Sequence, residues 1–309
     1  MIRIGSRGSQ LALWQANHIA DALRALGQEV SITTIQTTGD RLQAVPFAHV
    51  GSKGMFTREI EDALLEQRID LAVHSLKDLP TELAPPFVIA AVTKRLDARD
   101  AFVSARFRTI DELPPGARVG TSSLRRQSQL RAAWPQFEYV EFRGNVDTRL
   151  RKLSEGQVEA AVLAAAGLDR LGRTEWVRVR FAEDVLCPAP GQGALAIECR
   201  AEDAATQTVL AVLEDAQTRF CVTAERVALA ALGGGCQVPI GAFCRHGDRV
   251  EGSTGEEFHL AGCVSSPDGS TVLRAEAWGS DAQALGATVA DQLLKRGALQ
   301  LLAAAPLSR

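Results

Sequence analysis

The chain has 309 residues, of which 46% are hydrophobic and 23% charged, and its formal net charge is −3. This length and composition predict a globular protein of two or three domains, and the slightly negative charge argues against a general nucleic-acid-binding protein. No apolar stretch approaches the roughly 20 residues that a membrane-spanning helix needs.

Strands and helices alternate through the first ninety residues. The hydrophobic pattern predicts strands at 2–6, 30–37 and 71–74 and helices at 10–26 and 56–67. The first residues have the pattern of a strand rather than of a signal peptide. This order predicts a mainly parallel sheet with helices on both faces.

The same alternation restarts after a charged connector at residues 97–100. We predict strands at 101–104, 118–120, 138–142 and 160–164, with helices at 123–133, 146–153 and 165–171. In such open sheets ligands bind at the carboxyl ends of the strands. Beyond a Pro-rich break at 187–191, a helix at 218–232, strands at 240–244, 258–264 and 272–277, and a helix at 281–296 predict a small α+β domain.

Arginine stands at three junctions between a strand and a helix, at Arg7, at Arg125 and Arg126, and at Arg143. A helix N-terminus carries partial positive charge and free N–H groups, so a cation there is unfavourable unless an anion binds beside it. We interpret the junctions as sites for carboxylates or phosphates; the alternative is that these arginines pair with surface Asp or Glu. Residues 118–180 contain 12 Lys or Arg and 7 Asp or Glu, an excess of five positive charges that fits a small polyanionic ligand.

One of the six cysteines follows three glycines, in the segment Gly233-Gly234-Gly235-Cys236. Glycine allows close backbone approach, so Cys236 can project from a loop as a reactive thiol; the alternative is a helix end followed by a partly buried cysteine. The six cysteines form no CxxC pair and no metal-binding pattern, which predicts a reducing compartment, the cytoplasm, and no metal site.

Polar residues follow the predicted strand at 71–74. Asp78 lies beyond its carboxyl end, where it is either a reactive carboxylate or a turn residue paired with Lys77. His74 fits a packed histidine better than a base. Lys53, in a glycine-containing segment before the next helix, offers another cation, or belongs to an ordinary flexible loop.

The motifs occur in an order that closely resembles the porphobilinogen deaminase family, also called hydroxymethylbilane synthases. The resemblance covers nearly the whole chain and rests on Arg7-Gly8-Ser9-Gln10-Leu11-Ala12, Gly51-Ser52-Lys53-Gly54, Val73-His74-Ser75-Leu76-Lys77-Asp78, Gly120-Thr121-Ser122-Ser123-Leu124-Arg125-Arg126-Gln127, Arg143-Gly144-Asn145-Val146-Asp147-Thr148-Arg149, Gly191-Gln192-Gly193-Ala194 and Gly235-Cys236-Gln237-Val238-Pro239-Ile240-Gly241.

The resemblance implies two α/β domains like the halves of periplasmic binding proteins and a small C-terminal α+β domain that carries the cysteine. Domain 1 would comprise residues 1–95 and 194–214, domain 2 residues 98–190, and domain 3 residues 217–309. It also implies a dipyrromethane cofactor, joined to Cys236 through a thioether, and a monomer that acts on a small molecule without nucleic acid or membrane.

The implied activity is that of a transferase. Four porphobilinogen molecules would be joined head to tail, each losing ammonia, and hydroxymethylbilane released for tetrapyrrole synthesis. Asp78 would be the catalytic carboxylate that stabilises the positive charge of the reacting pyrroles. The remaining implied site residues bind cofactor or substrate: Arg7, Ser9, Gln15, Lys53, Phe56, Ser75, Lys77, Thr121, Ser123, Arg125, Arg126, Arg143, Asn145, Arg149, Arg170 and Gln192.

Two other classes of protein fit part of the pattern. A two-lobed carboxylate-binding protein explains the arginine junctions but gives Cys236 no role. A transferase with a thiol nucleophile explains Cys236 but not so many cations. The mass of the intact chain separates the three, because only the deaminase carries two linked pyrroles on Cys236.

Overall fold

A computed structural model describes residues 1–38, 57–235, 238–247 and 257–303. The chain forms two compact units, one built from Met1–Arg95 and Ala194–Arg219 and the other from Leu96–Gly193 and Phe220–Leu307. Among the described residues, no helix is both long enough and apolar enough to span a bilayer.

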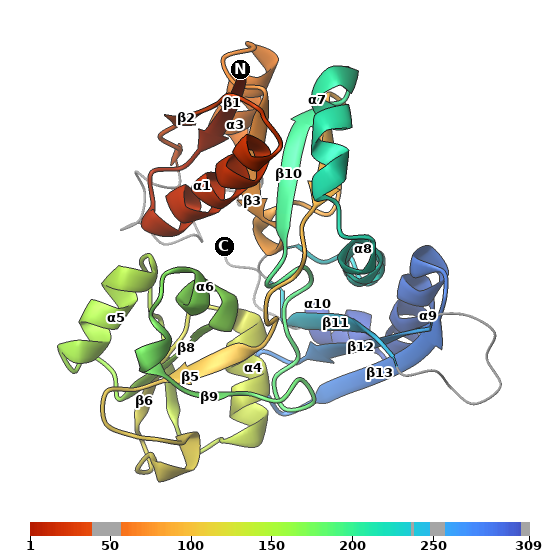
Figure 1. The fold of residues 1–309 in the computed structure, drawn as a ribbon. Helices are drawn as coiled ribbons and strands as arrows, with labels where there is room; N and C mark the ends of the chain where they lie inside the picture. The colour runs from red at the N-terminus through yellow and green to blue at the C-terminus, as the bar shows by residue number, and fades with distance from the viewer. Residues whose placement is uncertain (39–56, 236–237, 248–256, 304–309) are drawn as a thin grey trace. The chain divides into compact units, whose positions relative to one another are not determined.

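The first unit contains a five-stranded sheet in the order β2-β1-β3-β10-β4 (Figure 1). Its three leading strands run parallel to one another, whereas β10 is antiparallel to both β3 and β4. The strands are β1 (Ile2–Ser6), β2 (Val30–Thr34), β3 (Leu71–Ser75), β4 (Phe87–Val92) and β10 (Leu195–Arg200).

Helices cover both faces of this sheet. Helices α1 (Gln10–Ala25) and α7 (Ala204–Leu210) bury apolar residues against one face, where Leu71 and Val73 of β3 point. Helix α3 (Arg58–Leu65) packs on the other face, which receives Ala72. Because side chains alternate along a strand, one strand supplies both cores. Two 3₁₀ turns, η2 (Leu76–Asp78) and η5 (Ala211–Leu213), complete the unit.

The second unit contains a five-stranded sheet with a matching order, β7-β6-β8-β5-β9. Strands β6, β7 and β8 are parallel, and β5 is antiparallel to β8 and β9. The strands are β5 (Asp100–Val103), β6 (Arg118–Gly120), β7 (Glu138–Val140), β8 (Ala160–Ala164) and β9 (Val177–Arg180). The antiparallel fourth strand is therefore common to both sheets.

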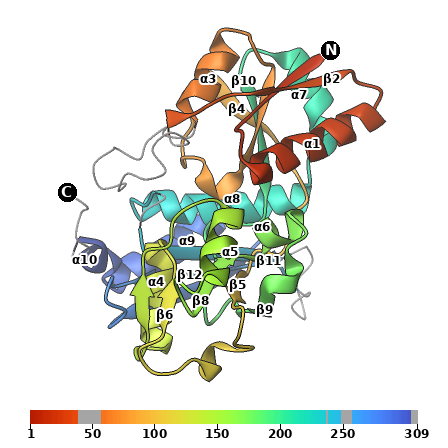
Figure 2. The same cartoon turned by 90° about the vertical axis from the view of Figure 1, so that its left-hand side faces the viewer.

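Residues of β8 divide the core of this sheet into two layers. Ala160 and Val162 share a core with helix α4 (Leu124–Ala133), whereas Ala161 and Leu163 share one with helices α5 (Val146–Ser154) and α6 (Ala165–Arg170). The three helices are labelled in Figure 2. The unit also contains the 3₁₀ turns η3 (Ile110–Glu112) and η4 (Thr174–Trp176).

A three-stranded antiparallel sheet, β11-β12-β13, belongs to the same unit. Its strands are β11 (Ile240–His246), β12 (Phe258–Ser265) and β13 (Val272–Gly279). Helices α8 (Ala216–Ala231), α9 (Ala282–Lys295) and α10 (Ala298–Ala303) complete the fold, and side chains such as Ala224, Leu260 and Leu293 form a fully buried core between helices and sheet.

The predicted fold class, α/β sheets with a small C-terminal α+β portion, is confirmed. Three strands, β4, β9 and β10, were not predicted. The sheets are also less parallel than expected, because β10 and β5 run against their neighbours. Hydrophobic periodicity indicates that a segment is a strand but contains no information on its direction in the sheet.

Candidate active site

The carboxyl ends of β1 and β3 lie at one edge of the first sheet, because these strands are parallel. Arg7 follows β1, and Ser75 ends β3. Helix α1 begins at the same edge, where the hydroxyl of Ser9 accepts a hydrogen bond from the Ala12 N–H and caps the helix. Gln15, one turn further on, is buried and donates through Nε2 to Ser75 Oγ at 2.9 Å. Two predicted site residues 60 positions apart therefore meet.

Asp78 lies in the turn η2, directly beyond the end of β3. Its side chain is exposed and makes no hydrogen bond or ion pair with the described residues, so it does not pair with Lys77. Lys77 is half-buried in the same turn. A carboxylate without an internal partner keeps all its acceptor positions available to a ligand.

His74 is a packed histidine, as expected. It is buried within β3, and its Nε2 lies 2.9 Å from Oε2 of Glu198, a fully buried residue of β10. Nothing in the local sequence singles out Glu198, because the contact spans 124 positions. This side-chain contact links β3 to β10 immediately before the turn that contains Asp78.

Three predicted polar residues of the second sheet hold the ends of strands and the starts of helices. Ser123 caps α4 by accepting from the Arg126 N–H at 3.4 Å, and Asn145 caps α5 by accepting from the Thr148 N–H at 2.9 Å. Thr121 Oγ1 accepts from the Ser123 N–H. These bonds satisfy N–H groups that a helix start leaves open, so the side chains shape the junctions that contain the arginines.

Arg125 and Arg126 converge on one buried carboxylate, Asp100, at the start of β5. Arg125 Nη1 and Arg126 Nη2 each lie 2.7 Å from an oxygen of Asp100, and Gln192 donates to the same carboxylate at 2.9 Å. The alternative of pairing with an acid therefore holds for these two arginines, although the acid is buried rather than at the surface. Asp100 lies at the carboxyl ends of the parallel strands of the second sheet, because β5 is antiparallel and its first residue pairs with Ala164, the last residue of β8.

Arg143 and Arg149 lie around the start of α5. Arg143 forms an ion pair with the exposed Glu141, as the alternative of a surface pair predicts, and its carbonyl accepts from Lys152 Nζ at 3.1 Å. Arg149 is half-buried in the first turn of the helix.

Arg170, at the end of α6, is a buried cation without a carboxylate partner. Its Nη2 donates to the carbonyl of Gly193 at 2.8 Å, and its buried Nε makes no hydrogen bond with the described residues. Burial lowers the pKa of Arg170 to about 10, an effect that the charge of Asp169 only partly offsets. Asp169 itself pairs with Arg180 at 2.7 Å.

The segment that contains Gln192 is held close to the connector at 96–100. Leu96 N donates to the Gly193 carbonyl at 3.2 Å, and Gln192 Nε2 donates to the Ala98 carbonyl at 2.7 Å. Gly193 has a φ of +90°, and a Cβ there would lie 2.6 Å from the Leu96 carbonyl oxygen. This position therefore needs glycine for both conformation and space.

Three predicted site residues, Lys53, Phe56 and Cys236, lie outside the described residues. The glycines before Cys236 are described. Gly233 ends α8 with a φ of +68°, and a Cβ on Gly234 would lie 2.4 Å from a methyl group of Leu229. A Cβ on Gly235 would meet nothing within 4 Å among the described residues. Within that part of the chain, close approach to a glycine of this segment is seen at Gly234.

Besides Glu198, two residues important to this geometry were not among the predicted ones. Asp100 was seen only as part of a charged connector, and Gln129 was not considered. The buried amide of Gln129 pairs with the main chain of Cys187, accepting from its N–H at 2.8 Å and donating to its carbonyl at 3.2 Å. A charged residue opening an apolar run, as in Asp100-Ala101-Phe102-Val103, was the available signal for Asp100.

The described side chains offer two kinds of chemistry. The edge of the first sheet presents a free carboxylate, and the edge of the second presents guanidinium groups in excess over their carboxylate partners. Guanidinium groups suit a ligand that carries several carboxylates, and a free carboxylate suits a step in which positive charge develops. In the described part of the chain, no cluster of His, Cys, Asp and Glu could hold a metal ion.

Comparison with known proteins identifies the family. Residues 2–208 match the model described as porphobilinogen deaminase, dipyrromethane cofactor binding domain, and residues 219–295 match the C-terminal domain of porphobilinogen deaminase. Porphobilinogen deaminase of Thiobacillus denitrificans is 48% identical over 309 residues, covering 99% of both chains. That of Brevibacillus brevis is 47% identical, covering 97% of this chain and 96% of its own.

Solved structures of periplasmic proteins also align with the chain. A periplasmic substrate-binding protein of an ABC transporter from Coxiella burnetii aligns with a TM-score of 0.43 and 14% identity, covering 69% of this chain and 91% of its own. The family models and the relatives at near-complete coverage carry the assignment. The chain belongs to the porphobilinogen deaminase family.

Proposed function

We propose that this chain joins four porphobilinogen molecules head to tail on a covalently held dipyrromethane, with loss of ammonia at each step, and releases hydroxymethylbilane. The observation that carries the proposal is the buried guanidinium of Arg170, whose described partner is a single main-chain carbonyl. A buried cation is costly without an anion, so this side chain is suited to a ligand that brings carboxylates.

The arginines would bind the acetate and propionate groups of the pyrroles. Each porphobilinogen brings two negative charges, and planar guanidinium groups bind carboxylates through two parallel hydrogen bonds. Arg125 supports this role, because its Nε and Nη2 make no hydrogen bond with the described residues. Further positive charge would come from Arg7, Arg143, Arg149 and Arg170. The arginine side chains would be oriented by the polar residues of the same segments, Thr121, Ser123, Asn145 and Gln192.

The arginines at the second sheet would also bind the carboxylates of the cofactor. The cationic edge of the second sheet matches a dipyrromethane, which carries acetate and propionate groups of its own, and Cys236 would hold it through a thioether. When bound, the cofactor supplies the pyrrole carbon to which the first substrate is joined. Lys53 and Phe56 would contribute to binding from their segment.

Asp78 would act on the substrate. Loss of ammonia from porphobilinogen leaves a cation, and a carboxylate held at the end of β3 can accept a hydrogen bond from the pyrrole N–H and stabilise that charge. The exposed carboxylate of Asp78 is free for this contact. Ser75, which accepts a hydrogen bond from Gln15, and Lys77 precede Asp78 in the sequence, and Ser9 adds a further polar group at this edge.

The proposal extends to organisation and setting. We expect three domains, at 1–95 with 194–214, at 98–190 and at 217–309, in a cytoplasmic monomer whose partner is a small molecule, with no nucleic acid or membrane. Size-exclusion chromatography with light scattering tests the monomer, and limited proteolysis tests the domain boundaries.

One experiment tests the function. The purified chain is incubated with porphobilinogen, and its intact mass and colour with Ehrlich's reagent are recorded before and after. A gain of two linked pyrroles that is absent from Cys236→Ser, together with release of hydroxymethylbilane, is expected. A chain that stays unmodified and consumes no porphobilinogen would exclude the proposal.

A further inference from the structure

Asp100 is the centre of a buried hydrogen-bond cluster that includes two predicted ligand-binding arginines. Its carboxylate is fully buried and accepts from Arg125 Nη1 at 2.7 Å, from Arg126 Nη2 at 2.7 Å and Nε at 2.9 Å, and from Gln192 Nε2 at 2.9 Å. Asp100 is therefore the shared partner of three residues that are expected to bind the pyrroles.

The two arginines use this carboxylate differently. Arg126 donates with all three guanidinium nitrogens, to Asp100, to the Val162 carbonyl and to Gln192. Arg125 donates with Nη1 alone, to Asp100 and to the Cys187 carbonyl at 2.7 Å. Asp100 thus holds one side of the Arg125 guanidinium and leaves the other side without a partner among the described residues.

Asp100 is the carboxylate that the described contacts place against both guanidinium groups. Burial alone would raise the pKa of Asp100, but the charges and hydrogen bonds of Arg125 and Arg126 outweigh it and hold that pKa well below its ordinary value. Asp100 therefore stays ionised across the physiological range and remains an acceptor for both arginines.

We propose that Asp100 is a positioning residue, which orients Arg125 and Arg126 and leaves the Nε and Nη2 side of the Arg125 guanidinium open to a carboxylate of the pyrroles. This inference rests on the proposed function. It assigns to Asp100 no contact with substrate, because the side chain is fully buried and both of its oxygens already accept hydrogen bonds within the protein.

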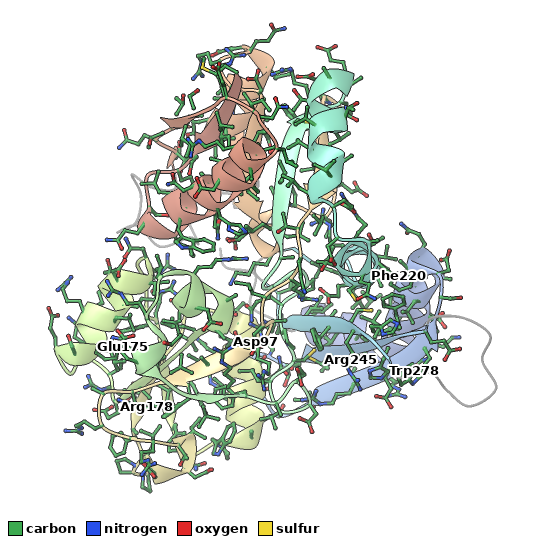
Figure 3. The ribbon with its side chains drawn as sticks, in the orientation of Figure 1. Asp97, Glu175, Arg178, Phe220, Arg245 and Trp278 are labelled. Atoms are coloured by element: carbon green, nitrogen blue, oxygen red, sulfur yellow. The ribbon has the colours of Figure 1, made fainter. Side chains whose placement is uncertain are left out.

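A matched control lies three residues away. Asp97 also binds two arginines, with Oδ2 at 2.7 Å from both Arg99 and Arg180 (Asp97 is labelled in Figure 3). Neither of these arginines is expected to touch the pyrroles. Asp97→Asn and Asp100→Asn therefore remove the same charge from the same kind of cluster, but only the second acts on the proposed ligand-binding residues.

The test compares melting temperatures of the cofactor-free and the dipyrromethane-loaded protein, the latter prepared with porphobilinogen and verified by intact mass. In Asp100→Asn the cofactor-free form lacks the carboxylate that Arg125 and Arg126 share, whereas the loaded form gains anions from the ligand. The gap between the two melting temperatures should widen by about 3 °C or more over wild type. In Asp97→Asn both forms should fall together and leave the gap unchanged.

Asp100→Glu separates position from charge. The longer side chain keeps the negative charge but displaces the arginines, so the gap should not widen while kcat falls about tenfold or more. Asp97→Glu should stay within about twofold of wild type. If Asp100→Asn does not fold without cofactor, the turnover of Asp100→Glu decides the question, and a near-normal kcat overturns the inference.

The outcomes distinguish this inference from the function on which it rests. An unchanged gap in Asp100→Asn, with normal loading of the wild-type chain, would make Asp100 purely structural and leave the proposed function intact. Failure of the wild-type chain itself to acquire dipyrromethane would refute the proposed function.

Discussion

The two five-stranded sheets share an arrangement of three parallel strands followed by an antiparallel fourth strand, yet the side chains at the carboxyl ends of their parallel strands differ. In the first sheet Asp78 is exposed and has no partner among the described residues. In the second sheet Asp100 is buried, and the cations around it are bound to it or, like Arg170, buried without a carboxylate. Both sheets place an antiparallel strand next to the parallel ones, so the difference lies in the side chains.

This difference leads us to expect different roles for the two groups of side chains, one in turnover and the other in ligand binding. A charge that already has a protein partner stabilises the fold and offers little to a ligand, whereas a charge without one is available for binding or catalysis. Asp78 is then expected to act mainly on turnover, and Arg170 on binding. Substitutions at the two edges should separate these effects.

The largest effect is expected at Asp78. Asp78→Asn should lower kcat by about 100- to 1,000-fold, because preorganised charge that stabilises a transition state is typically worth about 3–4 kcal/mol. Folding and cofactor loading should persist, since the side chain contacts no described residue. Steady-state kinetics and intact mass measure both. The control is Glu82→Gln, which removes an exposed carboxylate four residues further along the chain.

Two outcomes would contradict the role of Asp78 in turnover. Near-normal turnover of Asp78→Asn would remove Asp78 from the reaction. A loss of cofactor loading without a loss of kcat in the loaded fraction would make Asp78 a binding residue like the arginines, and the proposed division between the edges would fail.

Arg170 should show the opposite combination of effects. Its pKa of about 10, against an ordinary value of 12.5, corresponds to a cost of roughly 3 kcal/mol for keeping the charged form buried. Arg170→Gln removes that cost but also the bond to the Gly193 carbonyl, so the cofactor-free protein should be as stable as wild type or more so. Cofactor loading or kcat/KM should fall about 10- to 100-fold, the loss expected for one charged hydrogen-bonded contact.

Arg180 provides the matched control for Arg170. It pairs with both Asp97 and Asp169 at 2.7 Å, so Arg180→Gln should lower the melting temperature without changing cofactor loading. A cofactor-free Arg170→Gln protein that is clearly less stable than wild type would show that Arg170 stabilises the fold. Its guanidinium would then not be a cation kept available for a ligand carboxylate.

Much of this architecture could be predicted from local pattern. The predicted strands 2–6, 118–120 and 160–164 coincide with β1, β6 and β8, and the three arginine junctions lie where expected. Asp100 could not be assigned its place, because its partners lie 25, 26 and 92 positions away and meet it only through the antiparallel direction of β5. For the same reason periodicity alone could not tell which arginines already have a partner.

The smallest effect concerns Asp97, which pairs with cations at the second sheet but lies outside the proposed site. Burial raises the pKa of Asp97, but hydrogen bonds from Arg99 and Arg180 outweigh it and hold that pKa below its ordinary range. A carboxyl group whose folded pKa lies below its unfolded value stabilises the fold above about pH 4, and this contribution is lost as the pH falls further.

Wild type should therefore lose more stability than Asp97→Asn between pH 5 and about pH 3. The difference should be about 1 kcal/mol or less, because Asp97 is partly exposed and solvent screens its ion pairs. Melting temperatures of both proteins at each pH measure it, and Asp21→Asn, which removes an exposed pair with Arg24, should follow the wild-type curve. Parallel curves for wild type and Asp97→Asn would mean that the ion pairs of Asp97 with Arg99 and Arg180 add no stability to the fold. Asp97 would then not be energetically comparable to Asp100.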